Sequence, residues 1–302
     1  MKKIILFFLP LSSQVLRISV FTIFFSMTIS LVLSQSKKFQ KQHSILKKDF
    51  EKSIKNPNNA LQNIEKILIL IQDEFSKTKN EKGVWNLNYY LKCAKYTRAM
   101  IYFDLHKPSI CKEELSKYSE EQVLKGEVKT DFYSYYPNLP WFSKDANIRN
   151  LWLWYCVMGY SEVFLRKNED GVVFFDKLIK SIENEWDKTL KEYKGRYDDN
   201  FFRNEKGYYV PNLSNAYACR ADAYRILDKL EKTILDCNSG LKILDDNAGI
   251  GGERRPYGIL YYNRAGANKK LGNIQRACKD MNIAKSFNYN VTEKELKEVC
   301  KD

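Results

Sequence analysis

Small and apolar residues recur at fixed spacings along the chain, and the C-terminal third shows the pattern most clearly. Residues 261–286 read YYNRAGANKKLGNIQRACKDMNIAKS, where Ala265 is followed twelve residues later by Ala277 and four residues after that by Met281. Residues at such spacings lie on one face of a helix. The intervening LGN at 271–273 contains a glycine, which commonly ends a helix. The stretch therefore predicts two antiparallel helices that cross closely where their side chains are small.

The same twelve-residue spacing of small residues occurs three more times upstream, at Ala221 and Thr233, Gly159 and Gly171, and Ala99 and Cys111. A tyrosine stands four positions before the first small residue in three copies, whereas Lys95 stands there in the fourth. A degenerate hairpin precedes these copies, because Ala60, Ile64 and Ile67 repeat the second-helix pattern. The predicted fold class is therefore all-α. The expected helical hairpins lie near residues 45–75, 92–118, 152–182, 214–244 and 258–287.

These hairpins resemble tetratricopeptide repeats, which are helix–turn–helix units of about 34 residues. The two copies that match best are YACRADAYRILDKLEKTILDCNSGLKIL, from Tyr217, and YYNRAGANKKLGNIQRACKDMNIAKSF, from Tyr261. Tyr224 occupies the aromatic position of the family, and Asn268 departs from it. The resemblance implies antiparallel hairpins stacked as a right-handed solenoid over residues 35–300, with insertions between the repeats.

The insertions follow from the register, because the first small residues step by 60, 62 and 44 positions. They fall at residues 119–150, 191–215 and 245–258. Part of the second one is expected to extend the helix that begins at Val172. Insertions in repeat arrays often lie on the binding face. The first contains the aromatic run FYSYYPNLPWF at 132–142, a candidate platform for a peptide or a sugar. Its candidate residues are Tyr133, Tyr135, Tyr136 and Trp141. The alternative is that these rings cover a flank of the solenoid.

Proteins of this family generally line a concave groove with the first helix of each hairpin. By register, the resemblance places in that groove Tyr96, Met100, Phe103, Tyr160, Arg225, Tyr262, Asn263 and Lys269. Asn263 stands where some family members grip a chain-end carboxylate, but aromatic and apolar residues replace the cationic partners in the earlier hairpins. The expected groove is apolar with a basic C-terminal end, and the expected ligand is a protein or peptide.

The C-terminal end carries a candidate capping box and a candidate disulfide. Thr292, with Glu295 three residues later, predicts a short capping helix over 293–300 that folds back along the last hairpin. Cys278 and Cys300 then lie at similar heights on antiparallel helices, within reach of a disulfide. The alternative for each cysteine is a buried free thiol. The chain has seven cysteines, so at least one is free or pairs between chains.

The N-terminal residues 1–34 read as a targeting segment, since they contain Lys2, Lys3 and Arg17, no acidic residue, and two apolar runs. We expect a signal peptide cleaved near Ser34, which would export the protein to a periplasm or the exterior. The alternative is an uncleaved membrane anchor at residues 18–33. In either case the membrane is contacted only through this segment.

The remaining composition gives no sign of catalysis. The formal net charge is +13, but basic residues alternate with acidic ones, and no run of five like charges occurs. Together with export, this argues against a nucleic-acid partner. His43 and His106 are the two histidines, and both are expected at the surface. No enzyme motif occurs, so we expect no catalytic residue, cofactor or metal.

The sequence therefore predicts a non-enzymatic, exported module for protein–protein interaction. Two alternatives remain open. The first is an envelope-assembly component held by an N-terminal anchor, and the second is a glycan- or polymer-binding protein that uses the aromatic run.

Overall fold

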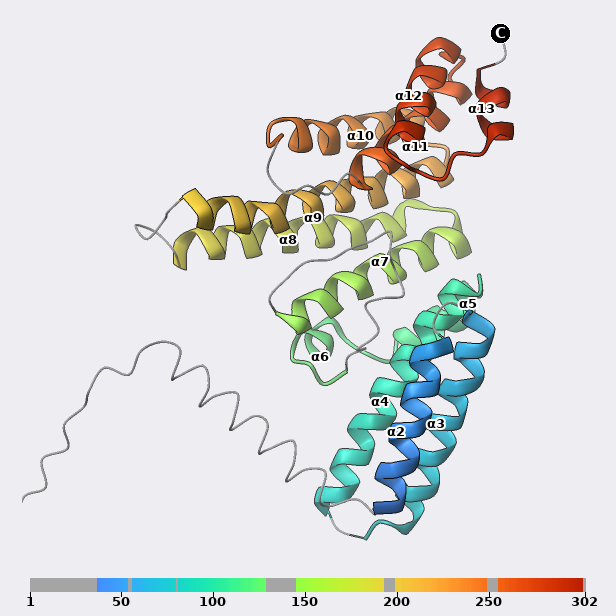
Figure 1. Cartoon of the computed structure of the whole chain (residues 1–302), viewed down its shortest axis with the longest axis vertical. Coiled ribbons are helices and arrows are strands. Elements are labelled where there is room, and N and C mark those ends of the chain that lie inside the picture. The colour runs from blue at the N-terminus through green and yellow to red at the C-terminus, as the bar shows by residue number, and fades with distance from the viewer. Residues whose placement is uncertain are drawn as a thin grey trace, which may run out of the picture. The chain divides into compact units, whose positions relative to one another are not determined.

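The computed structural model describes residues 37–53, 56–79, 81–128, 145–192, 199–248 and 255–300. Within these ranges every regular element is a helix (Figure 1), which confirms the all-α prediction. The chain divides into two compact units, Met1–Ala94 and Lys95–Asp302. None of the described helices combines the length and the apolar composition that crossing a membrane requires. The predicted targeting segment lies outside the described residues.

The first unit contains α2 (Lys37–Ser53), α3 (Pro57–Lys77) and the first part of α4 (Glu81–Asp104). Asn56 starts α3, because its side chain accepts hydrogen bonds from the backbone N–H groups of residues 58 and 59. Ala60, Ile64 and Ile67 are buried, as the apolar spacing predicts. The degenerate hairpin is therefore present as α2 and α3.

His43 differs from its expected position at the surface. It lies in α2 and is partly buried between aromatic rings, with ring centroids 5.6 Å from Phe39 and 5.4 Å from Tyr90. Burial is the main cause that lowers the pKa of His43. The expectation of a surface position was wrong. It relied on the polar neighbours of His43 in the sequence, whereas the helix places His43 on a face with aromatic contacts. His106, in contrast, is exposed at the turn after α4, where its φ is 54°.

The second unit contains the end of α4 and nine further α-helices. They are α5 (Pro108–Leu115), α6 (Glu120–Leu124), α7 (Ala146–Arg166), α8 (Val172–Glu192), α9 (Asp199–Ile226), α10 (Leu230–Asp245), α11 (Arg255–Lys270), α12 (Ile274–Ser286) and α13 (Glu293–Val299). A short 3₁₀ turn at Glu169–Gly171 precedes α8. In Figure 1, α7 and α8, α9 and α10, and α11 and α12 each pack as neighbours. Helix α9 also packs against α7 and α11, so the hairpins follow one another in chain order.

The small residues mark the closest approaches of the paired helices. Ala221, Thr233, Ala265 and Ala277 are fully buried. The tightest contact joins α7 to the start of α8, where a Cβ added to Gly171 would lie 2.5 Å from the carbonyl oxygen of Gly159. A side chain at Gly171 would therefore force the two helices apart.

The largest apolar core surrounds α7. Trp152 and Phe175 are almost completely buried there, and the indole N–H of Trp152 donates to the hydroxyl of Ser181 at 3.0 Å. Cys156 of α7 and Cys219 of α9 lie in the same core with their sulfur atoms 3.5 Å apart. The aromatic and apolar residues of α7 therefore join two consecutive hairpins.

The insertions differ in part from the sequence expectation. Most of residues 191–215 is helical: α8 extends to Glu192, and α9 begins at Asp199. The first insertion starts with α6, whose capping box joins Ser119 and Gln122, and it buries Val123 in the main core. Residues 129–144 lie outside the described residues, and with them the aromatic candidates Tyr133, Tyr135, Tyr136 and Trp141.

The C-terminal end forms as its sequence suggests. Thr292 and Glu295 form the capping box of α13, and a disulfide joins Cys278 to Cys300 across a Cα–Cα distance of 4.8 Å. Val299 of α13 is buried with the small residues of the last hairpin. Helix α13 thus covers apolar surface of the hairpin α11–α12, and the disulfide holds it there.

Candidate functional site

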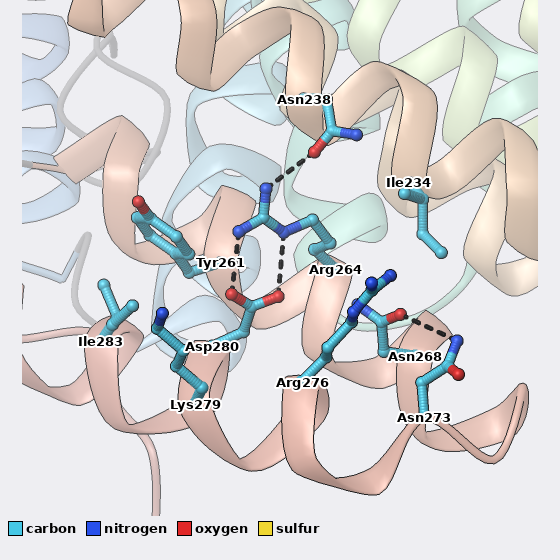
Figure 2. Close-up of a pocket in the computed structure, with 10 residues that line it drawn as sticks. All are labelled: Ile234, Asn238, Tyr261, Arg264, Asn268, Asn273, Arg276, Lys279, Asp280 and Ile283. Atoms are coloured by element: carbon cyan, nitrogen blue, oxygen red, sulfur yellow. Dashed lines mark hydrogen bonds and ion pairs between the residues drawn. The ribbon is translucent and has the colours of Figure 1, made fainter.

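A pocket of about 500 Å³ lies among α10, α11 and α12 (Figure 2). We call it the C-terminal pocket, and its lining residues are Ile234, Asn238, Tyr261, Arg264, Asn268, Asn273, Arg276, Lys279, Asp280 and Ile283. Tyr261, Arg264 and Asn268 of α11 form its floor together with the buried Asp280 of α12. Asn238, Arg276 and Lys279 are exposed along α10 and α12. The pocket therefore needs two consecutive hairpins.

Arg264 occupies the centre of the pocket and is held from three sides (Figure 2). Its Nε and Nη2 atoms donate to the carboxylate of Asp280, both at 2.8 Å, and its Nη1 donates to Oδ1 of Asn238 at 2.7 Å. The guanidinium also lies over the ring of Tyr261, 5.1 Å from the centroid. The hydrogen bond with Asp280 raises the pKa of Arg264. This ion pair is a rigid floor rather than a free charge.

Arg276 and Lys279 are the free charges of the pocket. They stand three residues apart on α12, are exposed, and make no ion pair or hydrogen bond with other described residues. Residues three apart lie on the same helix face. With Arg264 and Asp280, the pocket has three cationic side chains and one carboxylate, a formal charge of +2. The pocket is therefore basic.

Three asparagine side chains add hydrogen-bonding capacity. Asn273 donates to the side-chain oxygen of Asn268 at 3.3 Å, and Asn268 is only 5% exposed. The amide nitrogens of Asn268 and Asn238 make no hydrogen bond with other described residues. Ile234 and Ile283 provide apolar walls. The pocket thus offers two unpaired cations, two unpaired amide donors and two aliphatic surfaces.

The preceding hairpins contain an equivalent arrangement, which we call the central cluster. Its residues are Glu169, Asp176, Tyr217, Arg220, Tyr224, Lys232, Leu235 and Asp236. Arg220 donates to both carboxylate oxygens of Asp236, at 2.8 and 2.7 Å, and its third contact is Asp176 at 2.7 Å. Arg220 precedes Arg264 by 44 positions, and both guanidinium groups use the same nitrogen atoms. The two frames are therefore geometrically alike.

The central cluster neutralises its own cations. Lys232, which corresponds to Arg276, donates to Glu169 at 2.7 Å and lies over the ring of Tyr224. Leu235 stands where the C-terminal pocket has Lys279. Lys229 also pairs with Glu169, at 3.4 Å, so three cations face three carboxylates in the cluster. In the pocket Asn238 replaces Asp176, and Glu231, the counterpart of Glu169, makes no ion pair with Arg276. Of these two sites, the C-terminal pocket therefore has an excess of positive charge and the central cluster has none.

A third Arg–carboxylate pair joins α4 to α5. Arg98 donates to Glu114 through Nε at 3.1 Å and through Nη2. In all three hairpins the acid follows the arginine by 16 residues. The sequence contained this signal, since the arginine directly precedes the first small residue of the repeat. The apolar spacings that predict the hairpins do not include these charged positions.

The groove expected from the resemblance is not open at several of its positions. Tyr96 and Met100 are 0% and 4% exposed and pack in the main core. Asn263 is 1% exposed, and its amide donates to the carbonyl oxygen of Ala218 at 3.3 Å. The expectation that these three side chains face a ligand was therefore wrong. They serve helix packing because neighbouring first helices contact one another directly.

The other expected groove residues also have partners in the fold, with one exception. Phe103 and Tyr160 pack on each other with centroids 6.0 Å apart. Arg225 pairs with Asp222 at 2.6 Å, and the hydroxyl of Tyr262 donates to Glu295 at 2.9 Å. Lys269 is exposed. The structure does not bring these eight residues together into one basic and apolar groove.

No group of three or more metal-ligating side chains lies close together among the described residues. In comparisons with known proteins, no family model, no curated protein and no solved structure matches the chain. The resemblance to tetratricopeptide repeats therefore rests on the residues and spacings of this chain.

Proposed function

We propose that this chain is a tetratricopeptide-like solenoid that acts as an exported, non-enzymatic module for protein–protein interaction. A protein partner binds at the C-terminal pocket. The order of packing supports this proposal, since described hairpins that pack against one another in chain order build an extended surface for binding. The Cys278–Cys300 disulfide is typical of proteins that work in an oxidising compartment, and thus supports export.

One observation carries the proposal. Among the described residues, Arg276 and Lys279 have no ion-pair partner, whereas the equivalent cluster in the preceding hairpins is internally neutralised. Cations that folding leaves unpaired in a concave site are ready to bind an opposite charge. The pocket lining contains no pairing of a nucleophile with a general base, so its groups are suited to binding rather than to bond cleavage.

The test is a crosslinked pulldown of the exported protein from its own source. We expect wild-type protein to capture a specific protein, and Arg276→Ala/Lys279→Ala to lose it. The control is Lys242→Ala/Lys297→Ala, which removes the same charge from exposed positions of α10 and α13 outside the pocket. Equal capture by all three proteins, or capture of no specific protein, would contradict the proposal. Cell fractionation of the same material distinguishes the exported form from the anchored alternative.

A further inference from the structure

The difference between the C-terminal pocket and the central cluster indicates what kind of ligand the pocket takes. In the central cluster Asp176 and Glu169 provide carboxylates beside Arg220 and Lys232, at 2.7 Å in both cases. The pocket has the same frame, but Asn238 replaces Asp176, and Glu231, the counterpart of Glu169, does not line the pocket. A ligand that supplies carboxylates would therefore restore a charge arrangement that this fold already uses once.

From this we infer that the C-terminal pocket binds an acidic, extended segment of a partner protein, with a carboxylate side chain seated between Arg276 and Lys279. The inference rests on the proposed function and specifies the chemistry of the partner. A carboxylate matches the guanidinium of Arg276 because two parallel N–H groups can donate to its two oxygens. Lys279 lies on the same face of α12 and adds a second positive charge next to it.

The amides of the pocket favour a peptide over a free anion. Each peptide unit offers one N–H donor and one C=O acceptor. Asn238 and Asn268 present amide nitrogens that have no partner among the described residues, and these can donate to backbone carbonyls of a bound chain. A bare phosphate or sulfate would leave these donors and the apolar walls unused. The mixture of groups therefore fits a polypeptide.

The walls of the pocket favour an aliphatic neighbour for the acidic residue. Ile234 of α10 and Ile283 of α12 are both partly buried, and both border the cavity. Successive side chains of an extended chain point to opposite sides. An acidic residue on one side can thus contact α12 cations while its neighbour packs on an isoleucine. The cavity of about 500 Å³ lies within the ~300–1,000 Å³ typical of ligand sites.

A dense polyanion fits less well. The buried carboxylate of Asp280 is part of the floor, and only two cations are unpaired. Nucleic acids and sulfated glycans derive their affinity from many ion pairs along an extended basic surface. Such a ligand would find two such contacts in the pocket. We therefore assign the pocket to a side-chain carboxylate of a protein.

The experiment is a selection from a random heptapeptide library displayed inside a constrained loop, so that no peptide has a free end. Wild-type protein is expected to enrich sequences with an Asp or Glu next to Ile, Leu or Val. The Arg276→Ala/Lys279→Ala variant is expected to show no such enrichment, and the Lys242→Ala/Lys297→Ala control is expected to enrich the same sequences. The most enriched sequence is then synthesised with blocked ends, together with a version in which Gln replaces Glu. We expect at least tenfold weaker binding of the Gln version.

Three results would overturn the inference. These are a selection without acidic enrichment, equal binding of the Glu and Gln peptides, or heparin fragments that bind at the pocket more tightly than the Glu peptide. The pulldown separates this inference from the proposed function. A partner captured through the pocket but not displaced by the Glu peptide leaves the function standing and refutes the acidic ligand. Peptide binding without any captured protein refutes the function and supports the ligand chemistry.

Discussion

The central cluster and the C-terminal pocket use the same Arg–Asp pair, with Arg220 on Asp236 and Arg264 on Asp280. The side chains of both carboxylates are almost inaccessible, at 5% and 7% exposure. Around this common frame the cluster adds acidic partners, and the pocket replaces them with amides or leaves cations free. The comparison teaches that one helical frame can carry two different charge environments. The two environments differ in whether the neighbouring charges are balanced within the chain.

The largest effect is expected from removing the arginine of each frame. Arg220→Met and Arg264→Met should each lower the free energy of unfolding by about 3–5 kcal/mol, because each leaves a buried carboxylate without its partner. The Arg220 variant should lose about 0.5 kcal/mol more, since Asp176 and Asp236 then repel each other. Chemical denaturation of both variants measures this difference. Replacing both Arg220 and Asp236 by apolar residues should restore most of the loss, and failure to do so would show that the frame is more than an ion pair.

Loss of the C-terminal disulfide should affect the pocket and spare the cluster. Cys278→Ser/Cys300→Ser opens a link between residues 22 positions apart, which should cost about 3 kcal/mol of stability in the last hairpin. Hydrogen exchange should become faster at the amides of α12 and stay unchanged in α9. Equal acceleration in both helices would mean that the hairpins unfold as one unit. That result would remove the basis for treating the two regions separately.

Exchanging the charged residues that distinguish the pocket from the cluster should also exchange their ability to bind the acidic peptide. Asn238→Asp/Lys279→Leu gives the pocket the charges of the cluster, and we expect at least tenfold weaker binding of the acidic peptide. The reciprocal variant, Asp176→Asn/Leu235→Lys, should show measurable binding of the same peptide at the cluster when the pocket is blocked by the first exchange. Fluorescence anisotropy measures both. Unchanged binding by the first variant would contradict the assigned role of the charges.

The smallest effect concerns pH. The hydrogen bond from Lys232 lowers the pKa of Glu169 below its usual value of 4.5. A carboxyl with a lowered pKa in the folded state contributes stability above the unfolded pKa, and this stability is lost as the pH falls through the folded pKa. Wild-type protein should therefore lose slightly more stability below pH 4.5 than Glu169→Gln, as followed by thermal melts. Glu231→Gln is the matched control at the pocket. It should behave as wild type, because Glu231 forms no ion pair with another described residue.

The hairpins could be predicted from the sequence because their signal is local. Ala221, Thr233, Ala265 and Ala277 mark the crossings directly, since a close approach of two helices admits only small side chains. The start of α9 was harder to predict from the sequence. Pro211 interrupts the helix pattern and yet lies inside α9, because the packing of its neighbours outweighs its own poor helix propensity.

The pocket could not be predicted in the same way. It combines Asn238 of one hairpin with Arg276 and Lys279 of the next, and no spacing within a single repeat reports how two repeats are offset. The resemblance also placed the binding groove on the first helix of each hairpin, but Tyr96 and Met100 of such a helix are buried. The 16-residue spacing from arginine to acid identifies the Arg–acid pairs. It does not indicate which of these hairpins keeps cationic side chains without an ion-pair partner among the described residues.

The spacing of the ion pairs also bears on the order in which the molecule assembles. Each Arg–acid pair closes a loop of 16 residues inside its own hairpin, and short loops lose little entropy on closure. A chain that emerges from the ribosome can thus fix the register of one hairpin before the next is synthesised. The bond from Arg264 to Asn238 spans 26 residues and needs the earlier hairpin, and Cys300 follows both hairpins in the chain. The pocket is therefore completed after the frame that supports it, and its disulfide closes only after both of its hairpins have been made.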